Sequence, residues 1–389
     1  MKKVFNLLVS FVLIAGFSAC SKDDSGNQQV PKNPVPSADY KGLAFISSGE
    51  STVRLAQVGT PYEISLEYST DETHWKPYTI GETITLADST FLLFRDGEHR
   101  NHRFSKDTEN YYHFEISGPI SAQGNIMSLL NRNFSTPLSK YVFFALFEGC
   151  TSLLSAPELP ATTMEYGCYS QMFSGCTALK STPELRAEVL AMKCYQHMFR
   201  GCSTLTSAPG LPATKMEQAC YFGMFSECTG LTSAPELPAK VLASNCYGKM
   251  FQGCSALTSA PELPATEMKF YCYNSMFTNC TKLTSAPKLP AKRLESNCYL
   301  SMFEGCTSLT SAPELPATEL VSHCYEFMYK DCRKLRYVKA LFTTSPSEET
   351  TKDWLSGVAA SGTFVKSKNA SWNVTGVHGI PNGWKIETQ

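Results

Sequence analysis

The sequence is poor in charge. Of its 389 residues, 18% are charged, and the net charge is −1 at pH 7. A balance so close to zero gives no electrostatic reason to expect nucleic acid or an anionic membrane surface as a partner. Long apolar runs are also lacking, because the run from Val4 to Phe17 is too short to span a bilayer comfortably.

Recognisable catalytic patterns are missing as well. There is no nucleophile elbow, no phosphate-binding loop, no metal-ligand pair with suitable spacing and no Ser/His/Asp constellation placed by its context. Isolated carboxylate pairs leave an enzyme open as an alternative. The sequence therefore predicts a protein that is not an enzyme and that uses no cofactor and no metal.

The N-terminus has the features of a secretion signal. Lys2 and Lys3 precede the apolar run, which ends in Phe17-Ser18-Ala19-Cys20. This ending resembles the lipobox of bacterial lipoproteins, with Phe17 where leucine is usual. The resemblance implies that residues 1–19 are a signal peptide and that Cys20 carries lipid, so that lipid alone anchors the chain to a membrane. An ordinary cleaved signal with an incidental cysteine is the alternative.

The residues after Cys20 predict an exposed stalk. Ser21-Lys22-Asp23-Asp24 resembles the acidic tract that directs some lipoproteins to the outer face of the outer membrane, which implies a Gram-negative bacterium. The polar and proline-containing segment 20–38 cannot bury enough apolar surface to fold.

Residues 39–130 alternate polar and apolar side chains, as β-strands do. Turn-forming residues separate six candidate strands: Leu43–Ser47, Thr52–Val58, Glu63–Tyr68, Thr83–Leu86, Thr90–Arg95 and Tyr111–Ser117. Short strands at this spacing predict a small all-β sandwich, Ig-like, as a separate domain.

Two features of this segment allow a functional interpretation. Trp75 follows a turn and is either a platform for stacking sugars or a cap on the sandwich. His99 and His102 lie among arginines in a short basic loop, which either contacts an anion or partner or is simply solvated. As a metal site the two histidines lack a third ligand.

A 26-residue unit is repeated from residue 131 to 342. The dipeptide Cys-Tyr recurs every 26 residues, at Cys168, Cys194, Cys220, Cys246, Cys272, Cys298 and Cys324. A second cysteine follows eight positions after each of these cysteines. Fixed periods of about 20–50 residues predict stacked supersecondary units.

Each unit predicts one helix and one very short strand. Leu190, Cys194, Met198 and Cys202 recur at a spacing of four, as on the apolar stripe of an α-helix. The sequence Leu-Thr-Ser-Ala then supplies a strand, which a proline ends. The predicted fold class is an α/β leucine-rich-repeat solenoid with an N-terminal all-β sandwich and a small C-terminal cap.

The repeats carry a family resemblance. The pattern Met-Phe-x-Gly-Cys-Thr-x-Leu-Thr-Ser-Ala-Pro-Glu-Leu-Pro-Ala is similar to the BspA-like leucine-rich repeats of bacterial surface proteins. The resemblance implies adhesion to host matrix proteins or to other cells, and it implies no universal ligand-binding residue. Ala-Pro stands where an Ile-x-Ile-Pro strand is usual, so the length of the strand ladder is in doubt.

The cysteines allow three interpretations. A helical unit places its two cysteines too far apart for a disulfide. A buried cysteine behaves as a small apolar residue, and a column of cysteines fits a packed core. We therefore predict free core thiols, with some disulfides or a metal site as the alternatives.

A polar surface recurs in register on the other side of the unit. The candidate binding face comprises the repeated Thr-Ser pairs and the glutamates that follow them: Thr206, Ser207, Thr232, Ser233, Glu236, Thr258, Ser259, Glu262, Thr284, Ser285, Thr310, Ser311 and Glu314. Stacked strands lie about 4.8 Å apart, so the glutamates must face solvent. This face either binds a repetitive partner, such as a polysaccharide or fibrous protein, or is merely solvated.

The last segment, 343–389, is expected to cap the solenoid. Basic residues replace neutral ones in the last unit, as an open end requires: Arg333, Lys334, Arg336 and Lys339. Thr363–Lys366 and Trp384–Ile386 are expected as small strands and Trp354 as the start of a helix. The three tryptophans of this segment either cover the core or form a sugar site.

These observations predict a surface-exposed outer-membrane lipoprotein whose rigid array binds an extracellular protein or polysaccharide. The alternative is a glycan-binding accessory protein of a nutrient-capture system, with Trp75 and the polar face as its contacts.

Overall fold

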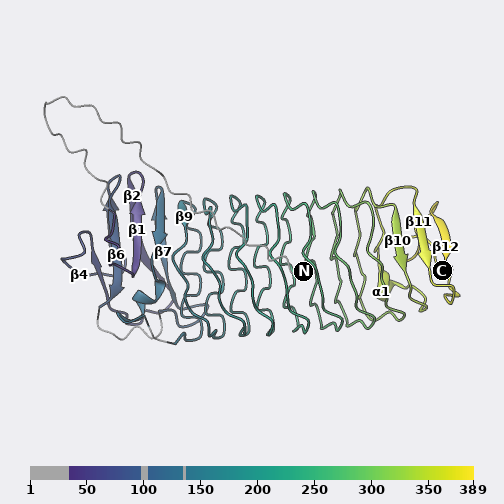
Figure 1. Cartoon of the computed structure of the whole chain (residues 1–389), viewed down its shortest axis with the longest axis horizontal. Coiled ribbons are helices and arrows are strands. Elements are labelled where there is room, and N and C mark those ends of the chain that lie inside the picture. Colours follow the sequence, from purple (N-terminus) through teal and green to yellow (C-terminus); the bar gives the residue numbers. More distant parts are fainter. Residues whose placement is uncertain (1–34, 98–103, 135–136) are drawn as a thin grey trace, which may run out of the picture. The chain divides into compact units, whose positions relative to one another are not determined.

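The computed structural model describes residues 35–97, 104–134 and 137–389. Pro34–Gln389 form one compact unit, in which antiparallel strands are followed by coils that lie side by side (Figure 1). The predicted signal peptide, Cys20, His99 and His102 lie outside the described residues, as does the stalk up to residue 34. Among the residues that are described, no helix is long and apolar enough to cross a bilayer.

The first part of the unit consists of two sheets. One has the order β4-β3-β6-β1-β8-β9, with strands β1 (Leu43–Ser47), β3 (Leu66–Ser69), β4 (Lys76–Pro77), β6 (Phe91–Asp96), β8 (Ile120–Gln123) and β9 (Leu153–Ser155). The other has the order β5-β2-β7, with strands β2 (Ser51–Val58), β5 (Thr83–Leu86) and β7 (Tyr111–Ser117). Five of the six predicted strands agree within one residue with β1, β2, β5, β6 and β7, whereas the strand expected from Glu63 begins at Leu66 as β3.

The two sheets share their hydrophobic core with the first coil. The ring of Phe45 lies 5.0 Å from that of Phe114 and 6.2 Å from that of Phe147, which belongs to the coil. The Phe114 amide donates to the Leu146 carbonyl at 2.7 Å, and Ile120 of β8 pairs in parallel with Leu153 of β9. One cluster of buried side chains therefore runs without interruption from the sheets to the C-terminal cap.

The segment that follows each unit's prolines is a chain of overlapping turns. Alternate amides donate to the carbonyl three residues before them, as Met172 does to Tyr169 at 3.3 Å. The amides between them donate to the next unit, as Tyr169 does to Cys194 at 3.0 Å. Every fourth residue has a positive φ, here 58° at Gln171 and 75° at Gly175. Such residues suit the third position of a tight turn but not an α-helix.

The predicted α/β fold class is therefore wrong. The helical segments of the described chain are η1 (Ile126–Leu129) and α1 (Glu348–Thr351), and neither lies in the repeats. A turn chain with a period of four buries the same positions as a helix with i, i+4 spacing, so Cys194, Met198 and Cys202 are fully buried as predicted. The burial pattern was correct, and the backbone that produces it is not helical.

The short strand expected in each unit is reduced, in most units, to an isolated bridge. Besides β9 and β10 (Tyr337–Ala340), the repeats show isolated parallel bridges, for example between Ser207 and Ser233 and between Ser259 and Ser285. Ala-Pro follows directly, and proline cannot donate to a ladder. Most of the cohesion between units thus comes from the turn chains and from the side chains inside them.

Aromatic side chains form two columns inside the coil. In one column the tyrosine rings from Tyr169 to Tyr325 stack with centroids 5.7–6.0 Å apart and planes within 8°. In the other, the rings from Phe147 to Tyr329 stack at 5.4–5.8 Å. Identical rings can stack in this way because each unit repeats the backbone of the one before it.

The C-terminal segment closes the other end of the array. Strands β10, β11 (Thr363–Lys366) and β12 (Lys385–Thr388) form a parallel sheet. The strand expected at 363–366 is confirmed, and the one expected from Trp384 begins at Lys385 as β12. The helix expected to start at Trp354 is wrong, because α1 (Glu348–Thr351) ends before it and Trp354 lies in a turn. Trp354, Trp372 and Trp384 are buried, and each donates its indole N–H to a backbone carbonyl. The interpretation that these tryptophans cover the core is confirmed.

Candidate binding face

Eight five-residue segments line one side of the array, and we call this surface the hydroxyl face. It comprises residues 151–155, 177–181, 203–207, 229–233, 255–259, 281–285, 307–311 and 333–337. The parallel bridges between successive serines bring these segments into register. All ten threonines and serines of the predicted candidate face belong to it, and all ten are exposed.

The threonines of this face tie neighbouring units together. Thr232 donates its hydroxyl to the Thr206 carbonyl at 3.1 Å, and Thr284 donates to the Thr258 carbonyl at 3.3 Å. The first threonine of the segment does the same, as Thr307 shows with the Thr281 carbonyl at 3.4 Å. The hydroxyl hydrogens of these threonines therefore point to the preceding unit, and their oxygens remain available as acceptors.

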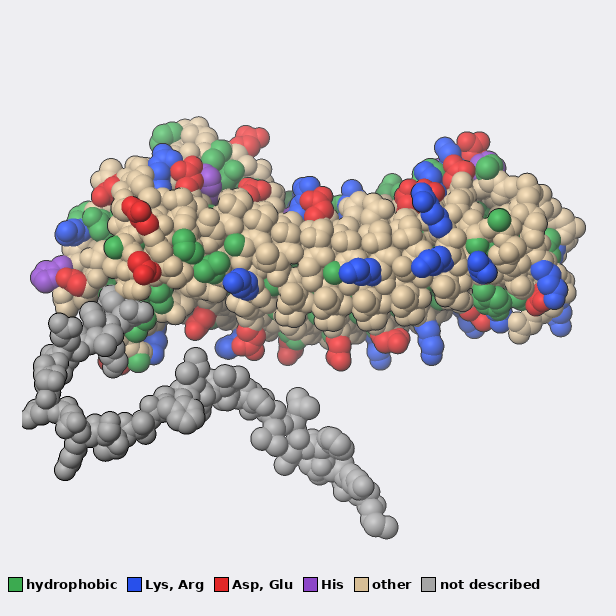
Figure 2. Space-filling model, turned by 90° about the horizontal axis from the view of Figure 1, so that it is seen from above, with side chains coloured by type: hydrophobic (Ala, Val, Ile, Leu, Met, Phe, Trp, Pro, Cys, Tyr) green, Lys and Arg blue, Asp and Glu red, His purple; other side chains and the backbone are tan. Residues whose placement is uncertain are grey.

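The predicted glutamates follow the hydroxyl face along the chain. Glu236, Glu262 and Glu314 are exposed, as the expected like-charge row requires. Two cations lie close to the row, because Lys339 pairs with Glu314 at 2.8 Å and Arg186 pairs with Glu184 at 2.6 Å. In Figure 2 the middle of the repeat array is mostly tan, and red side chains are confined to its two edges.

The interior beneath the face consists of buried side chains, with two columns of cysteines among them. The fifteen cysteines from Cys150 to Cys332 are free and buried, which confirms their predicted place in the core. The second cysteine of each unit donates its thiol to a phenylalanine carbonyl of the preceding unit, as Cys254 does to Phe225 at 3.1 Å. Burial raises the pKa of Cys168 and of Cys306 to about 12, so these thiols are neutral and unreactive.

A second exposed surface differs from unit to unit. Val189, Val241 and Phe270 are 52%, 68% and 51% exposed, although their equivalents in neighbouring units are polar or charged. Charged side chains line a hollow beside them: Glu267, Lys269, Lys292, Arg293, Glu295 and Glu319. The sequence analysis assigned no role to this surface, because a helical unit would place its residues on the outside of the helix with no consistent chemistry.

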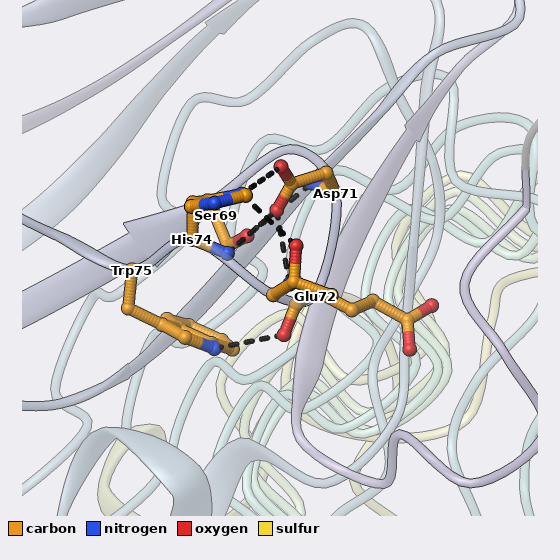
Figure 3. A network of polar contacts seen from close by, with 6 residues as sticks. Ser69, Asp71, Glu72, His74 and Trp75 are labelled. Atoms are coloured by element: carbon orange, nitrogen blue, oxygen red, sulfur yellow. Dashed lines mark hydrogen bonds and ion pairs between the residues drawn. The ribbon is translucent and has the colours of Figure 1, made fainter.

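Trp75 lies at the end of the turn that joins β3 to β4 (Figure 3). Its indole N–H donates to the Glu72 carbonyl at 3.0 Å. The guanidinium of Arg95 lies 3.7 Å from the centre of the ring, and Tyr40 packs at 6.0 Å. A sugar cannot stack on the ring face that Arg95 covers, so Trp75 is not the open platform that one interpretation required.

The turn before Trp75 is held by one carboxylate. Asp71 accepts the backbone amides of Thr73 and His74 at 2.9 and 2.8 Å, and its other oxygen lies 2.7 Å from the His74 ring (Figure 3). These bonds, the His74 amide first, hold the pKa of Asp71 well below its usual range. The arrangement is that of an Asx-type turn, which explains the local backbone.

Metal ligands do not come together in the part of the chain that the structure describes. Within residues 35–97, 104–134 and 137–389, no group of three or more His, Cys, Asp or Glu side chains is placed to hold a metal ion. The basic loop with His99 and His102 is not included, because it lies outside these residues.

Comparisons with known proteins add one structural similarity. No protein-family model matches the sequence, and no curated protein matches it. Among solved structures, the chain is similar to a leucine-rich repeat protein from Bacteroides ovatus, with 14% sequence identity and a TM-score of 0.25. The match covers 74% of this chain and 97% of that one. A TM-score this low supports no argument about the present chain.

Proposed function

We propose that the protein is a surface-exposed outer-membrane lipoprotein that binds an extracellular partner through its repeat array. The partner is a host matrix protein, the surface of another cell or a polymer, and the role is adhesion without catalysis. Cys20 carries the lipid, and the polar segment after it holds the array away from the membrane. The lipobox-like ending of the apolar run supports this location.

One observation supports the binding role most directly. The hydroxyl face exposes the same Thr-Ser pair in five successive units, from Thr206 to Ser311, above the stacked columns. A preformed surface loses little conformational entropy when it binds, and this lowers the cost of association. A regular face of this kind suits a partner that is itself repetitive.

The alternative role, glycan capture for nutrient uptake, shares this surface. It differs from adhesion in what happens to the bound polymer afterwards. Trp75 does not favour it, because Arg95 covers its ring.

The proposal is tested by binding of residues 20–389, with Cys20→Ser to prevent lipidation, to immobilised matrix proteins, bacterial cells and glycans. We expect saturable binding to at least one of them. Ser233→Glu combined with Ser259→Glu should abolish that binding, because two carboxylates would project from the middle of the face. Val241→Glu, on the variable surface, is the matched control and should bind normally. Absence of binding to any target, or full binding by the double variant, would refute the proposal.

A further inference from the structure

The hydroxyl face carries charge of a single sign. None of its eight segments contains an aspartate or glutamate, whereas five of its side chains are cationic and exposed: Lys180, Lys282, Arg333, Lys334 and Arg336. Among the described residues, none of these five takes part in an ion pair within 4.0 Å. The net charge of the whole chain is −1, so this local surplus is not a reflection of the composition.

Three of the cations form a cluster at the C-terminal end of the face. Arg333, Lys334 and Arg336 occupy the positions that Thr307, Ser308 and Thr310 hold in the preceding unit. The turn that follows has Ala359, Ala360 and Gly362 at these positions. Neutral side chains thus flank the cluster on both sides, and its positive potential is not cancelled within the face.

An exposed aromatic ring completes this end of the face. Tyr337 follows Arg336 and pairs with Ser311 through a parallel bridge, so it continues the serine column. Its side chain is 39% exposed, whereas the tyrosines of the stacked column are buried. An exposed ring beside cations can contact the apolar side of a sugar while the cations hold its acidic groups.

The hydroxyls of the face specify a second property of the ligand. In the middle of the face, the hydroxyls of Thr232, Thr258 and Thr284 lie 3.1–3.5 Å from backbone carbonyls of the preceding unit, and a hydroxyl that donates there presents its oxygen as an acceptor. A ligand that pairs with these three oxygens supplies donors at regular intervals, and sugar hydroxyls do so. The phosphodiester backbone of DNA supplies acceptors alone, and an acidic peptide supplies donors with no matching period.

We propose that the hydroxyl face binds an acidic polysaccharide. Its sugar hydroxyls donate to the threonine oxygens along the array, and its carboxylate or sulfate groups lie on Arg333, Lys334 and Arg336. The inference rests on the proposed function, because it names the class of partner that the same face binds.

The first test uses alginate and chondroitin sulfate as acidic probes and dextran as the neutral one, with residues 20–389 carrying Cys20→Ser. We expect saturable binding of at least one acidic probe, weakening as salt is raised, and no binding of dextran. The combined variant Arg333→Gln, Lys334→Gln and Arg336→Gln should bind at least about fivefold more weakly. The matched control Lys240→Gln, Lys292→Gln and Arg293→Gln removes three exposed cations elsewhere and should bind normally.

The second test separates a polysaccharide site from a general affinity for anions. Thr232→Val, Thr258→Val and Thr284→Val together remove the acceptor oxygens and keep the side-chain shape, and Thr→Ser at the same positions restores them. Acidic polysaccharide should bind more weakly to the valine variant than to the serine variant, and inorganic polyphosphate should not distinguish the two. Thermal unfolding of both variants identifies any loss that is due to misfolding, in which case the single variant Thr258→Val replaces the triple one.

Failure of this inference is distinguishable from failure of the proposed function. Equal binding of dextran and the acidic probes, or no effect of the three glutamines, would overturn the inference and leave matrix-protein binding untouched. Equal binding of the valine and serine variants would also overturn it, because the ligand would then be any polyanion. Binding of proteins or cells blocked by Ser233→Glu and Ser259→Glu, without binding of any acidic polysaccharide, would retain the function and reject the ligand class.

Discussion

Fifteen buried thiols lie in two columns through the array, and their burial has a thermodynamic consequence. A thiolate is costly in an apolar interior, so the folded state keeps these groups protonated. The pKa of Cys220 and of Cys272 is raised to about 12 from the ordinary value of 9.0. Folding therefore requires the neutral form of every thiol in the columns.

We expect the protein to lose stability steeply in mild alkali. Because the folded pKa values are raised, the thiols contribute their full stability below about pH 9 and lose it as the pH rises toward 12. Each thiol costs about 1.4 kcal/mol per pH unit in this window. Several thiols together exceed a total stability of about 5–15 kcal/mol, so unfolding should occur near pH 10. Urea unfolding at pH 7, 9 and 10 measures the decline.

A matched variant assigns this decline to the thiols. Cys246→Ala combined with Cys272→Ala should be less stable at pH 7 but should lose stability less steeply above pH 9. A free energy of unfolding that stays constant from pH 8 to pH 11 would contradict the argument.

At the scale of the element, the chain of turns replaces the expected helix. Its interior positions carry apolar side chains, and its outward positions adopt a positive φ every fourth residue. Glycine and asparagine adopt that conformation readily, whereas a bulky residue there is strained. The units therefore differ in local strain although their buried side chains are the same.

The interior of one turn chain is tested by Met250→Asp. Met250 is fully buried, and the variant removes its packing and introduces a carboxylate without a partner. We expect a loss greater than the about 2–5 kcal/mol that truncation to alanine costs. Val241→Asp in the same unit is the control, because Val241 is 68% exposed and should tolerate the charge. Equal thermal midpoints for the two variants would contradict the assignment of Met250 to the core.

Strain in the turn chain is tested at Tyr271. This residue has a φ of 56°, and the equivalent residues Asn245 and Asn297 have φ values of 57° and 59°. Tyr271→Asn should raise stability by about 0.5–1 kcal/mol, since asparagine pays less for a left-handed conformation. Tyr271→Phe keeps the strain and should leave the thermal midpoint unchanged. A lower midpoint for Tyr271→Asn would show that the tyrosine ring makes a stabilising contact.

At the scale of the whole molecule, every repeat packs against the next one through the same pair of surfaces, because the repeats have the same backbone. The sheets at one end and the cap at the other match these surfaces, as the contacts of Phe114 with Phe147 and of Trp354 with Tyr325 show. Residues 39–130 on their own would expose the apolar side that the first coil covers. We therefore attribute the folded state of residues 39–130 to their packing against the first coil of the array.

Removal of one whole unit should leave this scheme intact. Deletion of residues 231–256 joins Gly230 to Leu257 and keeps every column in register. We expect a soluble protein with a cooperative transition and a smaller denaturant dependence, because less surface is exposed on unfolding. Deletion of residues 231–243 shifts the columns by half a unit and should give an aggregated product. Similar behaviour of the two deletions would contradict the repeat-by-repeat packing.

The sequence predicted much of this fold because some of its patterns are compatible with a single kind of structure. Alternating side chains identified the strands from Leu43 to Ser117, and the 26-residue period identified the stack. It could not distinguish a helix from a turn chain, since both bury Cys194, Met198 and Cys202 at a spacing of four. Glycine recurs at some of the positive-φ positions, as at Gly167 and Gly175, but residues such as Gln171 hold the others, so the sequence carried only a partial sign of the turn chain.

For the candidate face, too, the sequence predicted some features and not others. Exposure of Thr232 and its equivalents followed from the repeated polar pair, whereas the direction of their hydroxyls depends on carbonyls in the preceding unit. Arg333, Lys334 and Arg336 were interpreted from the sequence as a polar end of the solenoid. Their place on the same face as the threonines becomes apparent only when the units are stacked.

The parallel tyrosine rings also give the molecule an optical property. Rings held 5.7–6.0 Å apart are close enough for excitation energy to migrate along the column from one ring to the next. The column ends against Trp354, whose ring lies 6.2 Å from that of Tyr325 and absorbs at lower energy than tyrosine. Light absorbed by the tyrosines of the column should therefore contribute to the fluorescence of Trp354, and removal of a ring near that end should reduce the contribution.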